Sequence, residues 1–222
     1  MVTSGKPGRG SDSGAGRAPK ARDRNRLLIL DTARAVLTEN PDAGMDDIAV
    51  AAGMVRRTLY GHFATRQTLL ASLAEAGATE FMEHVGAIDV RAADPSVEMA
   101  RLVLRTWGTA KRYGAIIDLA RRSCPDELLS AMGPFNSTVA ALIRHGQERG
   151  VFRSPLDAPL LAHLLEACAL TFLGERQREA WSGDEADVAG SHLLLLGVNA
   201  ADARRAVHEA ASRIAQEEPH AI

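Results

Sequence analysis

Apolar residues recur at three- to four-residue steps along most of the chain, the spacing that gathers them on one face of an α-helix. Leu27, Leu30, Ala33 and Leu37 follow this spacing up to the turn-forming residues 40–44. Further helices are expected over residues 46–52, 56–62, 66–85, 94–112, 115–121, 126–149, 155–181, 185–196 and 200–216. No segment shows the apolar–polar alternation of a strand. The pattern therefore predicts an all-α protein.

Two of the expected helices are very short and lie close together in the sequence. Residues 46–52 and 56–62 are separated by a turn that contains Gly53, and glycine adopts the left-handed backbone of such a turn without strain. Leu59 and Phe63, four residues apart, would attach the second short helix to the core. Two short helices joined in this way predict a helix-turn-helix.

Packing through that face turns a polar and basic face outward. In a helix-turn-helix, the first residues of the second helix reach base edges, and flanking groups bind phosphates. An arginine here can make a paired hydrogen bond to a guanine edge. The residues expected to contact double-stranded DNA are Arg56, Arg57, Thr58, Tyr60, His62 and Arg66.

The order of these residues is similar to that of a known family. From about residue 24 to 73 the chain resembles the DNA-binding domain of TetR-family transcriptional regulators, through Asp47-Ile48-Ala49, Ala52-Gly53, Thr58-Leu59-Tyr60, His62-Phe63, Arg66 and Leu69-Leu70. The resemblance implies an all-α homodimer of two-domain subunits. It further implies that the C-terminal domain binds a small ligand and that two late helices form the dimer interface.

Three positions depart from the family pattern. Met45 replaces the usual threonine that opens the first short helix, so its cap passes to Asp46 or is weakened. Val55 replaces the usual serine before the second, and losing such a cap costs about 1 kcal/mol of helix stability. Arg57 replaces a frequent glycine and adds a charge to the DNA face. We expect these changes to alter the contacts with phosphates and bases and to leave the fold intact.

Charge and composition divide the chain into three parts. Residues 1–22 are expected to be a disordered basic tail, 23–70 a helix-turn-helix DNA-binding domain, and 71–222 a domain for ligand binding and dimerisation. The predicted fold class is all-α, an N-terminal helix-turn-helix three-helix domain joined to a C-terminal helical bundle. Residues 1–66 carry 11 basic and 7 acidic residues, which suits docking on a polyanion. The tail either follows the DNA or stays solvated without fixed contacts.

The C-terminal part shows no constellation for catalysis. It contains no metal-ligand spacing, P-loop or dinucleotide-binding glycine motif, so no enzyme activity, metal or cofactor is expected. Cys124 and Cys168 fit no redox motif, which favours a reducing compartment. No secretory signal and no apolar run near the ~20 residues of a membrane span are apparent. We expect a cytoplasmic protein without a membrane partner.

A few large side chains are candidates for lining a ligand pocket between helices. A mostly apolar pocket is the usual form of a small-molecule site. The candidates are Met99, Trp107, Tyr113, Phe135 and Phe172, with Trp107 and Phe172 preferred. The same residues at helical spacing also suit an ordinary core. The ligand's chemistry is left open.

The late helices carry more apolar surface than one packing seam requires. Residues 160–172 form a wide stripe, and 193–196 are apolar on every side. Such faces suit a four-helix interface across a two-fold axis, or simply the core of the monomer. The functional hypothesis is a dimeric repressor that binds a palindromic operator and is released by a small ligand. The alternative is a helical small-molecule-binding protein or enzyme without sequence-specific DNA binding.

Overall fold

The computed structural model describes residues 21–217, and within this range the chain forms nine helices and no strand. This confirms the predicted all-α class. The helices are α1 Ala21–Glu39, α2 Met45–Ala51, α3 Arg56–His62, α4 Arg66–Val85, α5 Pro95–Ser123, α6 Pro125–Glu148, α7 Ala158–Gln177, α8 Glu185–Leu195 and α9 Ala200–Glu217. Apart from its last two residues, the expected tail 1–22 lies outside the described residues.

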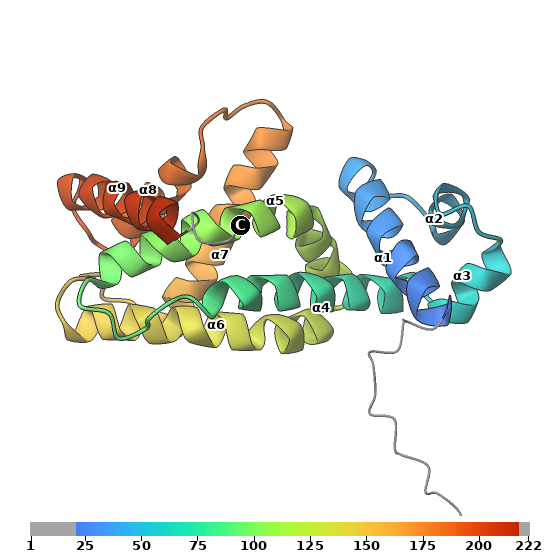
Figure 1. Cartoon of the computed structure of the whole chain (residues 1–222), viewed down its shortest axis with the longest axis horizontal. Helices are drawn as coiled ribbons and strands as arrows, with labels where there is room; N and C mark the ends of the chain where they lie inside the picture. Colours follow the sequence, from blue (N-terminus) through green and yellow to red (C-terminus); the bar gives the residue numbers. More distant parts are fainter. Residues whose placement is uncertain (1–20, 218–222) are drawn as a thin grey trace, which may run out of the picture.

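The first three helices form a small unit at one end of the molecule (Figure 1). Its core face on α1 consists of Ile29, Ala33 and Leu37, all fully buried. Leu27, which the spacing placed on that face, is exposed instead. The buried stripe advances by four residues each time, so it passes Leu27 by and takes Ile29. Helix α1 begins at Ala21, two residues earlier than the predicted residue 23.

The helix α4 leads from this unit into the body (Figure 1). The Thr65 hydroxyl caps it by accepting a hydrogen bond from the Thr68 backbone N–H at 3.1 Å. Its buried residues contact α1 at one end and α5 and α6 further along. One cluster of buried side chains joins Phe63 of the first unit to Leu70 of α4 and Ile116 of α5. The two parts of the protein therefore share a continuous core.

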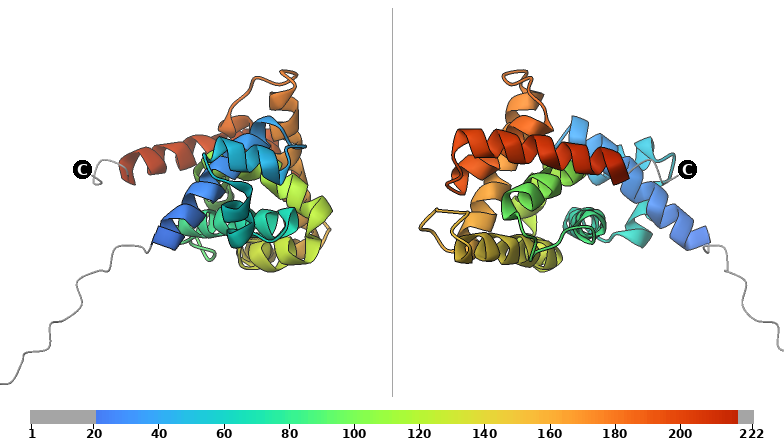
Figure 2. Two further views of the ribbon diagram at one scale, coloured as in Figure 1. Left: turned by 90° about the vertical axis from the view of Figure 1, so that its right-hand side faces the viewer. Right: turned by 60° about the vertical axis from the view of Figure 1, so that its left-hand side comes forward.

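The body is organised around α5, which packs against α4, α6, α7, α8 and α9 (Figures 1 and 2). The sequence predicted a break near Gly114, and this prediction was wrong, because the helix continues unbroken from Pro95 to Ser123. A Cβ atom at Gly114 would lie 2.5 Å from Cδ1 of Leu173. Glycine is there to let α7 approach α5, and not to end a helix.

The remaining boundaries agree with the expected helices to within a few residues. Helix α6 runs through Pro134. Helix α7 begins at Ala158, later than predicted, where the Asp157 side chain caps it and Pro159 sits in the first turn. Among the described residues, α7 is the one helix that is long and apolar enough to cross a membrane, by length and composition only. In the structure, 22% of its most apolar window is buried.

Candidate DNA interface and ligand cavity

The turn between α2 and α3 has the geometry that the sequence required. Gly53 has a φ of +64°, in the left-handed region. Ile48 and Ala49 on α2 and Leu59 on α3 are fully buried, so they fix the angle between the two short helices. Helix α3 has the predicted bounds and presents its other face to solvent.

The starts of these two helices lack side-chain caps, as the departures at Met45 and Val55 led us to expect. Gly44 holds the cap position of α2, and its N–H donates to Oδ2 of Asp47 at 2.8 Å. Asp46, the expected substitute cap, instead lies 2.5 Å from Nε of Arg56. Val55 holds the cap position of α3 with 70% of its surface exposed.

The expected DNA-contacting residues differ in how free they are. Arg57 and Tyr60 are exposed, with 42% of Tyr60 accessible. Arg56 is exposed but paired with Asp46, while Thr58 and His62 are half-buried. Arg57 and Tyr60 are therefore the side chains most available to a ligand on this face.

Arg66 has a structural task that the sequence did not reveal. Its guanidinium donates to the backbone carbonyls of Pro41 at 2.6 Å and Ala43 at 3.3 Å. It thereby fastens the α1–α2 turn to the start of α4. Arg26 is occupied in a similar way, because it lies 4.6 Å above the Phe63 ring and donates to Ser72 at 3.0 Å.

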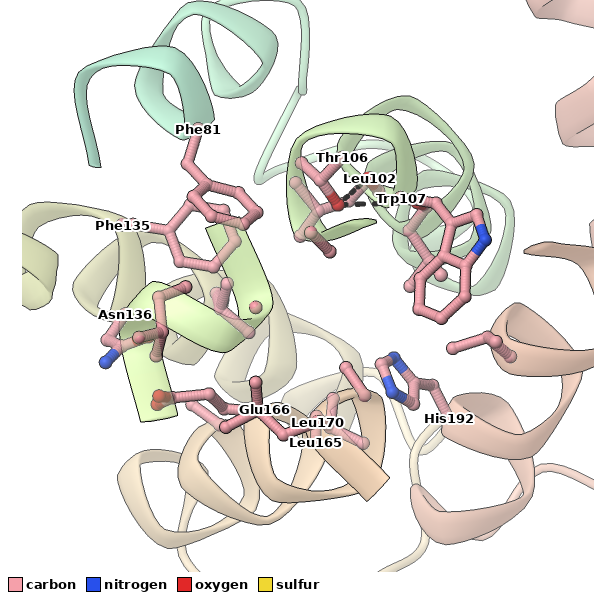
Figure 3. Close-up of a pocket in the computed structure, with 18 of the residues that line it drawn as sticks. Phe81, Leu102, Thr106, Trp107, Phe135, Asn136, Leu165, Glu166, Leu170 and His192 are labelled. Carbon is pink, nitrogen blue, oxygen red and sulfur yellow. Dashed lines mark hydrogen bonds between the residues drawn. The ribbon is translucent and has the colours of Figure 1, made fainter. Parts of the chain in front are cut away.

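A cavity of about 90 Å³ lies within the body, between α5, α6, α7 and α8 and capped by Phe81 of α4 (Figure 3). Its lining is almost wholly apolar. The side chains with polar atoms are Thr106, Trp107, Asn136, Glu166 and His192. In Figure 3, Asn136 and Glu166 lie on one side of the cavity, and Trp107 and His192 lie on the other. The geometry suits a small molecule that is mainly apolar.

Three of the five residues expected to bind a ligand line this cavity, namely Met99, Trp107 and Phe135. Tyr113 does not, because its ring packs against Gly77 of α4 and beneath Arg34 of α1, where it joins the first unit to the body. Phe172 lies outside the lining as well, with its ring centroid 4.8 Å from that of Trp181. Both corrections arise from helix rotations that spacing alone does not fix.

Phe81, Glu166 and His192 are among the lining residues that the sequence analysis did not name. The Phe81 ring contacts the Phe135 ring at a tilted angle, with the two centroids 5.0 Å apart. Glu166 accepts a hydrogen bond from Arg121 at 3.0 Å. His192 is 6% exposed, and burial lowers its pKa to about 4. No local signal distinguishes such a histidine from a surface one, because its burial comes from packing between helices.

Outside the cavity, α7 and the end of α8 expose large apolar side chains to solvent. Leu160 and Leu164 on α7, and Leu194 and Leu195 on α8, are each 40–51% exposed. They lie on two helices that contact each other, and large apolar side chains exposed in this way often mark a surface that meets another one. We call these four leucines the α7/α8 face.

Comparison with known proteins identifies the first unit. Residues 29–73 match the family described as "Bacterial regulatory proteins, tetR family". They form a TetR-family DNA-binding domain. The HTH-type transcriptional repressor LfrR of Mycolicibacterium smegmatis is 46% identical to the chain over 54 residues. These residues are 24% of this chain and 29% of the length of LfrR, so the match spans less than a third of that repressor.

Solved structures extend the likeness of fold beyond the TetR-family domain. The fatty acid degradation regulator FadR from Bacillus halodurans has a TM-score of 0.65 at 21% identity, over 82% of this chain and 97% of that one. LfrR from Mycobacterium smegmatis in complex with proflavine has a TM-score of 0.64 at 18% identity, over 80% and 97%. Most of the described chain, helical body included, therefore has the fold of these regulators.

Proposed function

We propose that the protein is a dimeric transcriptional repressor that binds a palindromic operator and releases it when a small molecule enters the body. The observation that carries this proposal is the TetR-family domain with an exposed α3 face. The relatives named above are transcriptional regulators, and the fold is shared along most of the chain. We expect it to act in the cytoplasm, where its DNA lies.

DNA recognition is assigned to the exposed face of α3. Arg57 at the second position of the helix can reach a guanine edge, and Tyr60 one turn later can donate to a phosphate. Arg56, Thr58 and His62 flank them, with Arg56 held in place by Asp46. Val55 offers an exposed methyl surface where a hydroxyl is usual in the family, which suits contact with a thymine methyl group.

The decisive test is binding to a DNA fragment from upstream of the gene that encodes the protein, measured by fluorescence anisotropy. We expect Arg57→Ala and Tyr60→Ala each to weaken binding about 10-fold or more. Arg204→Ala, at an exposed arginine of α9, is the matched control and should bind as the wild type does. Lack of binding to upstream fragments, or equal binding by all variants, would favour a helical small-molecule-binding protein or enzyme without DNA recognition.

Dimerisation is assigned to the α7/α8 face. An interface of two helices from each subunit would cover all four exposed leucines and would explain why so little of apolar α7 is buried in the single chain. A two-fold dimer also presents two α3 helices to the two halves of a palindrome. Light scattering should give twice the chain mass, and Leu164→Glu should give the monomer. Leu27→Glu changes a leucine that is exposed on α1, so that variant should remain a dimer.

Release by a ligand is assigned to the cavity in the body. The structure of LfrR is a complex with proflavine, so a TetR-like body can hold a small molecule. Here Phe81 of α4 caps the cavity, and α4 begins directly after the recognition helix. A ligand that shifts Phe81 would move α4 and change the position of α3. Such coupling requires that the ligand bind the two arrangements with different affinity.

A further inference from the structure

His192 lines the cavity, and one of its two ring nitrogens has no partner among the described residues. The residue lies on α8, is 6% exposed, and has the backbone of Leu165 on α7 beside its ring. Its Nε2 atom is buried and has no hydrogen-bond partner among residues 21–217. Figure 3 shows the ring beside the cavity, across from Asn136 and Glu166. Buried polar atoms nearly always have a partner, so an unpaired one at a cavity indicates that something else supplies it.

The protonation of the ring follows from these contacts. Burial lowers the pKa of His192 to about 4, so the imidazole is neutral at neutral pH. A neutral imidazole has one N–H and one lone pair. The Leu165 backbone raises the pKa of the ring, as a carbonyl beside the ring N–H does, and this assigns the lone pair to the unpaired Nε2. That atom can accept a hydrogen bond and cannot donate one.

The other polar atoms of the lining are already engaged or lie elsewhere. The Thr106 hydroxyl donates to the backbone carbonyl of Leu102 at 2.7 Å. Glu166 accepts from Arg121 on the opposite side of the cavity. Trp107 lies on the same side as His192, and in Figure 3 its indole nitrogen points away from the imidazole ring. The surroundings of His192 are otherwise apolar, so an ion placed among them would lose its hydration without gaining a counter-charge. The site beside His192 therefore favours an uncharged donor.

We propose that Nε2 of His192 accepts a hydrogen bond from a hydroxyl or N–H group of the ligand. The ligand class is then an uncharged, largely apolar molecule that carries a hydrogen-bond donor at the end that meets α8. This inference rests on the proposed ligand-binding function of the body. It assigns the selection of the ligand to a residue that no sequence motif marks.

The test uses two aromatic probes that differ in one hydrogen-bond donor, 2-naphthol and 2-methoxynaphthalene, with binding measured by calorimetry. The wild type should prefer 2-naphthol by about 5- to 10-fold, the usual effect of one neutral hydrogen bond. His192→Leu should lose this preference by weakening 2-naphthol alone. His192→Gln, whose amide oxygen can accept, should retain most of it. Thr106→Val, which removes a hydroxyl already paired within α5, should leave the preference unchanged.

Three outcomes would overturn the assignment: no binding of 2-naphthol, equal affinity of the wild type for both probes, or a preference that survives in His192→Leu. Circular dichroism of each variant shows whether it is folded, and the retained preference of His192→Gln guards against a merely structural effect. Operator binding without any probe is measured in parallel. If the wild type does not bind the operator, the proposed function is rejected, and the role of His192 is not affected. If the wild type binds the operator but shows no preference for 2-naphthol, only the role of His192 is rejected.

Discussion

At the scale of single residues, the burial of His192 couples the stability of the protein to pH. Its pKa is about 4 in the folded chain against 6.5 in an exposed setting, so the unfolded chain binds a proton first as pH falls. Stability from this residue is complete above pH 6.5 and is lost as pH falls toward 4. Glu166 is the other titratable group that lines the cavity.

We therefore expect the free energy of unfolding of the wild type to fall by about 2 kcal/mol more than that of His192→Gln between pH 7.5 and pH 5. Urea unfolding of both proteins at the two pH values measures this difference, and contributions from all other titrating groups cancel in it. A parallel pH dependence for the two proteins would show that His192 titrates normally and is not held neutral by burial.

Two arginines of the TetR-family domain should separate stability from DNA binding. Arg66 fastens the α1–α2 turn through two backbone carbonyls, so Arg66→Ala should lower the free energy of unfolding by about 1–2 kcal/mol. Arg57 is exposed and makes no such contact, so Arg57→Ala should leave unfolding within about 0.5 kcal/mol of the wild type. Chemical denaturation of the two variants, without DNA, checks the contrast. A destabilised Arg57→Ala would mean that this side chain also supports the fold.

At the scale of elements, α1, α4 and α5 meet around Tyr113. The Arg34 guanidinium of α1 lies 5.7 Å from the Tyr113 ring centroid, and Gly77 of α4 faces the same ring. A Cβ at Gly77 would lie 2.8 Å from Cδ1 of Tyr113, closer than side chains normally approach. Because Tyr113 is buried, the ring has little room to turn away. At this contact α4 packs tightly against α5, because Gly77 has no side chain.

Gly77→Ala is therefore expected to destabilise the protein by about 1–3 kcal/mol through overpacking. Gly190 of α8 is the control, since it also lies within a helix but a Cβ there meets nothing within 4 Å. Gly190→Ala should instead stabilise by about 0.5–1 kcal/mol, the gain in helix propensity. Thermal unfolding of both variants shows whether each is less or more stable than the wild type. A stabilised Gly77→Ala would show that α4 and α5 can move apart at this point.

The elements also show what local sequence could and could not specify. The bounds of α3 and the Gly53 turn were predictable because short-range packing and a left-handed glycine determine them. The unbroken α5 was not, because Gly114 serves a contact with Leu173, about sixty residues away in the sequence. The cavity was predictable as a class of site, and three of its residues were named. His192 was not named, because its role depends on a contact between α7 and α8.

At the scale of the whole molecule, the proposed dimer presents two positively charged α3 helices, one from each subunit, joined through the two helical bodies. Each α3 neutralises its own set of phosphates, and the number of phosphates neutralised determines how steeply binding weakens with salt. Loss of the α7/α8 interface leaves one recognition helix per molecule. The dimer and the monomer should therefore differ in the slope of binding against salt as well as in affinity.

In anisotropy titrations at several salt concentrations, the logarithm of operator affinity against the logarithm of salt should have about half the slope for Leu164→Glu that it has for the wild type. Its affinity should be at least about 100-fold lower, because one half-site alone holds the protein. Ala211→Glu adds the same charge at an exposed position of α9 and should match the wild type in both respects. Equal slopes for the wild type and Leu164→Glu would mean that a single TetR-family domain makes all the phosphate contacts, and that the exposed leucines of α7 and α8 serve something other than pairing two DNA-binding heads.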